Sequence, residues 1–170
     1  YEEVAGWNLL NAHRFAANGP RELRTQAVSY NIALALDGRI GIFDVSLSAQ
    51  RAEIQHDELN DNLILSELAQ AAIDTGVYNL YDPFGTPEDV LESFEVTGSR
   101  DANYLLRSLQ GTIATELFEL PGGTSRVLVG AELRDEDFED RPDALQAALR
   151  VTGIAANPSF GERELWAVFG

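Results

Sequence analysis

The segment from Thr25 to Leu36 alternates without a break between apolar and small or polar side chains, and this period limits the folds open to the chain. A repeat of two residues is typical of a β-strand with one buried and one polar face. The segment is longer than the usual strand of about 5–6 residues in soluble sheets and fits the roughly 9–11 residues of a membrane-crossing strand. Its apolar side is formed by Val28, Tyr30, Ile32, Leu34 and Leu36.

A second alternating segment follows at once and predicts a hairpin over residues 21–54. Asp37-Gly38 stands between the two segments, and Asp-Gly is a favoured pair for a two-residue type I′ turn. The apolar side of the second segment is formed by Phe43, Val45, Leu47 and Ala49.

Two more strands are expected to form a hairpin over residues 104–138, with its turn at Pro121–Gly123, and a fifth strand over residues 162–170. The charged residues of these strands fall on the parity opposite to the apolar ones, so we expect them on one polar face. In a barrel that face lines the lumen, and its candidates are Asp44, Glu116, Glu132 and Arg134. Glu132 and Arg134 are two residues apart, which predicts a lateral ion pair; contact with a plug or a passing solute is the alternative.

Residues 1–20 are expected to form a loop before the first hairpin, and the long segment 55–103 and residues 139–161 are expected to connect the strands. Two short helices are expected in the long segment. Asp61 would cap the first, with Leu65, Leu68 and Ala72 on one side, and Thr86 would cap the second, with Pro87 at its first position.

The connections therefore alternate short and long. This asymmetry is typical of an up-and-down barrel in an outer membrane, with tight periplasmic turns and long extracellular loops. A soluble sandwich usually has loops of moderate length at both ends. The expected fold is all-β, an antiparallel up-and-down meander of about five strands of a transmembrane β-barrel, with short helices in a long extracellular loop.

Composition excludes several other classes of protein. The net charge of −16 leaves no basic face for nucleic acid. The absence of cysteine excludes disulfides and thiolate metal sites. His13 and His56 are isolated and expected to be ordinary surface residues, and the acidic run 135–140 lacks the residue order of an EF-hand. We expect no catalytic, cofactor-binding or metal-binding residue, and no enzyme activity.

Four segments together resemble parts of one known family. Leu117–Gly123 looks like a family strand ending in a Leu-Pro-Gly/Ala-Gly turn, and Val127–Arg134 is similar to the strand that follows it. Tyr81–Gly85 resembles the Asn-Pro-Phe-Gly element of the preceding loop, and Glu164–Gly170 looks like the next strand. The order and spacing of the four also agree, and on these segments the chain resembles TonB-dependent receptors.

The resemblance implies that the chain is a mid-barrel part of a receptor in the outer membrane of a Gram-negative bacterium. Such a receptor has a plugged barrel of about 22 strands and imports a scarce solute such as a siderophore, a cobalamin or a glycan. The implied partners are outer-membrane lipid, the plug domain of the same parent chain, the TonB complex and the solute, with no nucleic acid. The alternative is a soluble all-β binding module without catalytic activity.

The long loop carries the candidate ligand-capture residues, because it combines aromatic groups with acids. These are Tyr78, Tyr81, Asp82, Phe84, Glu88 and Asp89. The alternative is that this loop only closes the barrel mouth. Aromatic girdles at the membrane interfaces could include Trp7, Tyr30, Tyr104 and Trp166, of which Tyr30 is expected on the apolar face and Trp166 on the inward one.

Overall fold

The computed structural model describes residues 13–170, which divide into two compact units. The sheet unit comprises residues 24–58, 99–143 and 156–170. The loop unit comprises residues 13–23, 59–98 and 144–155.

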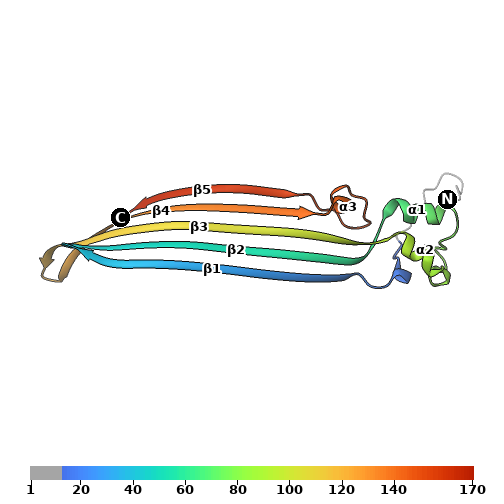
Figure 1. The fold of residues 1–170 in the computed structure, drawn as a ribbon, viewed down its shortest axis with the longest axis horizontal. Helices are drawn as coiled ribbons and strands as arrows, with labels where there is room; N and C mark the ends of the chain where they lie inside the picture. Colours follow the sequence, from blue (N-terminus) through green and yellow to red (C-terminus); the bar gives the residue numbers. More distant parts are fainter. Residues whose placement is uncertain (1–12) are drawn as a thin grey trace. The chain divides into compact units, whose positions relative to one another are not determined.

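Five long strands in chain order confirm the all-β antiparallel meander (Figure 1). Each strand pairs with its neighbour in the sequence, in the order β1-β2-β3-β4-β5. Their bounds are β1 Glu22–Ile40, β2 Phe43–Ile64, β3 Glu95–Leu120, β4 Gly123–Pro142 and β5 Ser159–Phe169.

The strands extend further than expected into the segments 55–103 and 139–161. β3 is 26 residues long, and its ladder with β4 runs from Arg100 opposite Pro142 to Leu120 opposite Gly123. The apolar alternation stops well before these ends, but the backbone continues to pair because polar residues satisfy the ladder equally well. The long connections are therefore only residues 65–94 and 143–158.

The first hairpin turns at Gly41–Ile42, so the expected turn at Asp37-Gly38 is wrong. Gly41 has a φ of +63°, the left-handed conformation that a tight turn requires and that glycine adopts without strain. Asp37 lies within β1 instead, where its carboxylate accepts a 2.6 Å hydrogen bond from Ser46 of β2. Extending the ladder past Asp37 adds cross-strand pairs that a turn there would lose.

The second hairpin turns at Pro121–Gly122, as predicted, and β4 begins at Gly123 with a φ of +134°. The register of the ladder shifts between Glu116 and Phe118, which marks a β-bulge beside the turn. Both tight turns thus lie at one end of the sheet, and the two long connections leave it from the other.

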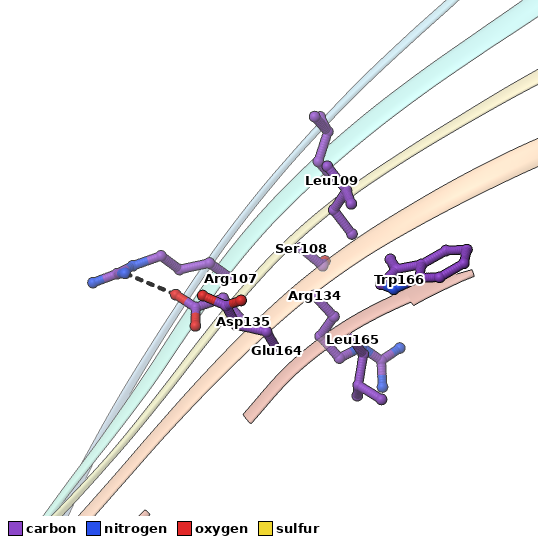
Figure 2. Close-up of a pocket in the computed structure, with 9 residues that line it drawn as sticks. Arg107, Ser108, Leu109, Arg134, Asp135, Glu164, Leu165 and Trp166 are labelled. Carbon is purple, nitrogen blue, oxygen red and sulfur yellow. Dashed lines mark hydrogen bonds and ion pairs between the residues drawn. The ribbon is translucent and has the colours of Figure 1, made fainter. Parts of the chain in front are cut away.

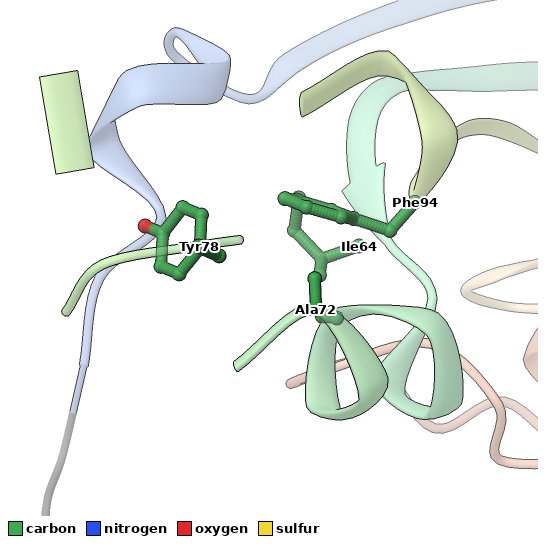
Figure 3. Close-up of a cluster of buried hydrophobic side chains, with 5 residues drawn as sticks. Ile64, Ala72, Tyr78 and Phe94 are labelled. Atoms are coloured by element: carbon green, nitrogen blue, oxygen red, sulfur yellow. The ribbon is translucent and has the colours of Figure 1, made fainter. Parts of the chain in front are cut away.

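The loop unit has its own aromatic core (Figure 3). Phe15 packs on Tyr78, with ring centroids 5.4 Å apart, and Tyr78 meets Phe94 edge-on at 5.7 Å. Its helices are α1 Ser66–Asp74, α2 Glu88–Ser93 and α3 Ala144–Ala147, with 3-10 turns η1 Ala16–Asn18 and η2 Pro83–Gly85. The buried members of the core are Ile64, Ala69, Ala72, Tyr78 and Phe94.

Both helices expected in the long loop are present, but neither has the expected cap. Asp61 belongs to β2, where its carboxylate accepts a 2.9 Å hydrogen bond from Thr97, and α1 begins after Leu65. Pro87 rather than Thr86 precedes α2, and the Thr86 hydroxyl is buried without a hydrogen bond. Asp61 lies in β2 and does not cap α1, because cross-strand pairing with β3 is available at this position.

Candidate functional site

The register of the strands separates the sheet unit into two chemically distinct faces. Residues opposite each other in an antiparallel ladder share a face. Ile113 lies opposite Val129 and Leu109 opposite Leu133, whereas Gln110, between them in sequence, lies opposite Glu132. One face of β3 and β4 is therefore apolar, and the other carries charge.

The apolar face continues across β2 and β1 and is exposed. A Cβ added at Gly111 would lie 3.8 Å from the Leu47 side chain, which joins the apolar sides of β2 and β3. Leu34 and Leu36 of β1 are 70% and 71% exposed. The apolar face comprises Val28, Ile32, Leu34, Val45, Leu47, Ile113, Val127, Val129 and Leu133.

A charged belt ends the apolar face on the side away from the turns (Figure 2). Arg107 lies opposite Asp135 and forms a 2.9 Å ion pair with it, and Asp135 lies opposite Glu164. A shallow hollow of about 410 Å³ lies at this boundary, with Leu109 and Trp166 among its lining residues. The apolar surface thus ends at this belt on the side away from the turns.

Trp166 lies on the apolar face, so the expectation that it faces inward is wrong. It lies opposite Leu133 and is 78% exposed. The inward assignment took Leu165 and Phe169 as the apolar side of β5, but the register places Leu165 opposite Arg134.

The other girdle candidates divide between the faces. Tyr30 has the parity of the apolar residues of β1 and is 57% exposed. Tyr104 lies opposite Phe138, on the face that carries charge. Trp7 lies outside the described residues.

All four predicted lumen-facing residues lie on the polar face, which we define by Asp44, Gln110, Glu116, Arg126, Glu132 and Arg134. Asp44 binds two arginines: Arg39 Nε is 2.8 Å from its Oδ1, and Arg126 is 2.6 Å from its Oδ2. Glu116 lies opposite Arg126 in the ladder. The two ion pairs of Asp44 thus join β1, β2 and β4 near the turns.

The lateral pair of Glu132 and Arg134 is present at 2.7 Å. Arg134 also lies 3.9 Å from Glu136, and Glu136 binds Arg163 of β5 at 2.8 Å. These ion pairs support the interpretation that the charges brace the sheet. Sequence reasoning missed Arg39, Arg126, Arg163 and Glu136. The alternation of a strand was enough to place Glu136 on the same face as Arg134, because the two are two residues apart.

The acidic run 135–140 is neutralised in part by arginines. Arg107 pairs with Asp135, Arg141 with Glu139 and Arg100 with Asp140. The Asp140 side chain is only 7% exposed and accepts two hydrogen bonds from Arg100. These hydrogen bonds hold the pKa of the Asp140 carboxyl below its usual 3.8.

Tyr78 is not a surface residue, so the structure removes it from the candidate ligand-capture set. Its side chain is 2% exposed, and its hydroxyl lies 2.7 Å from His13 Nε2. Burial raises the pKa of this phenol. His13 is half-buried and lies edge-on against Phe15 and Tyr78, so it is not the ordinary surface residue that we expected.

The remaining five capture candidates are exposed on the loop unit. Tyr81 and Phe84 are 95% and 75% exposed, and Asp82, Glu88 and Asp89 are exposed beside them. The Tyr81 N–H donates a 3.0 Å hydrogen bond to the side chain of Asn79, which stabilises the turn at this position.

Within residues 13–170, no group of three or more His, Asp or Glu side chains is arranged to hold a metal ion. No helix in that same range is long and apolar enough to cross a bilayer. Comparisons with protein-family models, curated proteins and solved structures find no match to this chain.

Proposed function

We propose that the chain forms part of the barrel wall of a TonB-dependent outer-membrane receptor that imports a scarce solute such as a siderophore, a cobalamin or a glycan. The observation that carries the proposal is the exposed apolar face, which spans the sheet opposite a face braced by ion pairs. A continuous exposed apolar surface indicates a partner. Strands of 19–26 residues in β1–β4 exceed what a soluble sheet uses, and the charged belt limits the apolar surface as the edge of a bilayer would.

In this proposal the apolar face meets lipid, and the polar face lines the lumen with its plug domain. The tight turns are periplasmic, and the loop unit is extracellular. The exposed candidates Tyr81, Asp82, Phe84, Glu88 and Asp89 would meet the solute first. Binding and gating, driven from the inner membrane through TonB, then constitute the activity, with no covalent chemistry.

Site-directed nitroxide labels on the two faces test the proposal. Labels at Ile113 and Val129 are expected to be accessible to oxygen dissolved in lipid after reconstitution of the receptor into vesicles. A label at Gln110, on the same strand as Ile113 but on the polar face, is the matched control and should not contact lipid. Accessibility of all three labels to a water-soluble nickel complex alone would favour the soluble binding module.

A further inference from the structure

The hollow at the edge of the apolar face lies where two unlike rows of side chains meet. Leu109 lies opposite Leu133, and Leu133 lies opposite Trp166, so one apolar row crosses β3, β4 and β5. All three residues line the hollow, whose volume is about 410 Å³. The next row belongs to the charged belt and lines the hollow as well. A ligand that fills the hollow is therefore apolar at one end and polar at the other.

The charged row offers a hydrogen-bond donor and an acceptor that the described residues leave unused. Arg107 reaches Asp135 at 2.9 Å and Asp137 at 3.9 Å through Nη1 alone, so its Nε and Nη2 bind no described residue (Figure 2). Glu164 lies opposite Asp135 and forms no ion pair with any described residue. Like charges directly opposite each other are destabilising, and Arg107 compensates only one of the two.

The charges of this row limit the chemistry of the ligand. One arginine and two carboxylates give the row a net charge of −1. A phosphate bound to Arg107 would lie beside Asp135, whose charge Arg107 already neutralises, so an anionic group is disfavoured. An ammonium group would suit Glu164 but would leave the Arg107 donors unused. A hydroxyl both donates and accepts, so a neutral group with several hydroxyls satisfies both residues.

Trp166 adds a flat apolar surface beside these polar groups. Its side chain is 78% exposed, and it lies on the same face of β5 as Glu164, two residues earlier. A sugar ring has an apolar face of carbon-bound hydrogens, which packs on an aromatic ring, and a rim of hydroxyls. An exposed indole beside an unused donor and an unused acceptor matches those two parts.

We propose that the hollow binds the neutral sugar headgroup of a membrane glycolipid. This proposal rests on the proposed function and names one class of lipid that the apolar face meets. The sugar ring stacks on Trp166, and its hydroxyls donate to Glu164 and accept from Arg107. The acyl chains leave the hollow over Leu109 and Leu133 and continue along the apolar face.

Quenching by brominated lipids tests the proposal on the intact receptor in phosphatidylcholine vesicles. A fluorescent label at Val168→Cys lies on the apolar face next to Trp166 but outside the lining of the hollow. Two lipids with the same dibrominated chains are compared at low mole fraction, a glucosyl diacylglycerol and a phosphatidylethanolamine. The glycolipid should quench about threefold more strongly, the effect of one or two net hydrogen bonds.

Two matched pairs of variants assign this preference to the hollow. Glu164→Gln should lower it about twofold, because a charge-assisted hydrogen bond is lost. Glu162→Gln removes the same charge from the same face of β5 outside the hollow and should leave the preference unchanged.

Trp166→Leu should remove most of the preference, and Trp166→Phe should retain part of it. Phe160→Leu removes an exposed ring from the same face of β5 outside the hollow and should have no effect. Unchanged quenching by phosphatidylethanolamine in each variant shows that the sheet still meets the bilayer.

Equal quenching by the two lipids would overturn the glycolipid proposal and leave the transporter proposal intact, because the label would still report hydrocarbon. Quenching by neither lipid would overturn the transporter proposal and the glycolipid proposal with it. Control variants that lower the preference as much as Glu164→Gln and Trp166→Leu would show that the hollow does not bind the headgroup.

Discussion

At the scale of single residues, Gly130 shows how closely the polar face is packed. It lies opposite Phe169, whose ring would overlap a Cβ added at Gly130. The same Cβ would come within 3.0 Å of Thr112 Cγ2. A glycine beneath an aromatic ring on the adjacent strand is a device that pins strand register.

Gly130→Ala is therefore expected to destabilise the protein by about 1–3 kcal/mol, the usual effect of overpacking. The midpoint of urea unfolding in detergent micelles measures the change. Gly111→Ala on the neighbouring strand is the matched control, because its new Cβ would find only ordinary contacts at 3.8 Å and beyond. Equal destabilisation by both would show that the Phe169 ring does not occupy the space above Gly130.

Asp140 makes stability depend on pH. Its pKa is lowered in the folded state, chiefly by the hydrogen bonds from Arg100. A carboxyl with a lowered folded pKa contributes stability that is complete above its unfolded value of about 3.9 and is lost as the pH falls through the folded value. We expect Asp140→Asn to reduce the free energy of unfolding at neutral pH and to flatten its fall below about pH 4. A titration of unfolding midpoints that parallels the wild type throughout would contradict this expectation.

At the scale of elements, the first hairpin has two candidate turn positions, the expected Asp37-Gly38 and the observed Gly41–Ile42. Gly41 has positive φ, whereas Gly38 does not, and neither has a neighbouring atom within 4 Å of its Cβ position. Alanine at either site is therefore free of clashes, and only backbone conformation distinguishes them. Gly41→Ala should cost about 1–2 kcal/mol, and Gly38→Ala should be neutral or stabilising by up to about 1 kcal/mol. Thermal unfolding of the two variants measures this difference, and the reverse order would restore the turn to Asp37-Gly38.

The same hairpin shows how far elements can be predicted from sequence. Alternation predicted five strands in the right order, because period two is the direct consequence of a pleated strand with unlike faces. It could not predict where the strands end, because the ladder continues through polar residues such as Asp37 and Asp61. Turn propensity is local, whereas the position of the turn is decided by the sum of cross-strand pairs.

The candidate site was predictable to the same limited extent. Parity placed Asp44, Glu116, Glu132 and Arg134 on one face, but their partners on other strands depend on register, which no local pattern contains. Tyr78 resembled its neighbour Tyr81 as a loop aromatic. Only the packing of distant segments reveals that one ring is buried and the other exposed.

At the scale of the whole molecule, the sheet unit cannot be understood from its own packing. The buried residues of the cluster that forms a hydrophobic core all lie in the loop unit, between Ile64 and Phe94. The sheet unit instead leaves many aliphatic side chains exposed on the apolar face, and its ion pairs lie on the polar face and in the charged belt. In the proposed receptor, a bilayer would cover the exposed apolar face.

The energetic difference between the two faces provides the last prediction. Val129→Arg places a charge on the apolar face and should cost about 2–4 kcal/mol in a bilayer if Val129 lies near its midplane. Gln110→Arg places the same group on the polar face, where it lies opposite Glu132 and close to charges that already form ion pairs. That variant should change the free energy of unfolding by less than about 1 kcal/mol. Reversible unfolding from lipid vesicles measures both variants. A cost for Val129→Arg no larger than that for Gln110→Arg would mean that the apolar face does not meet hydrocarbon.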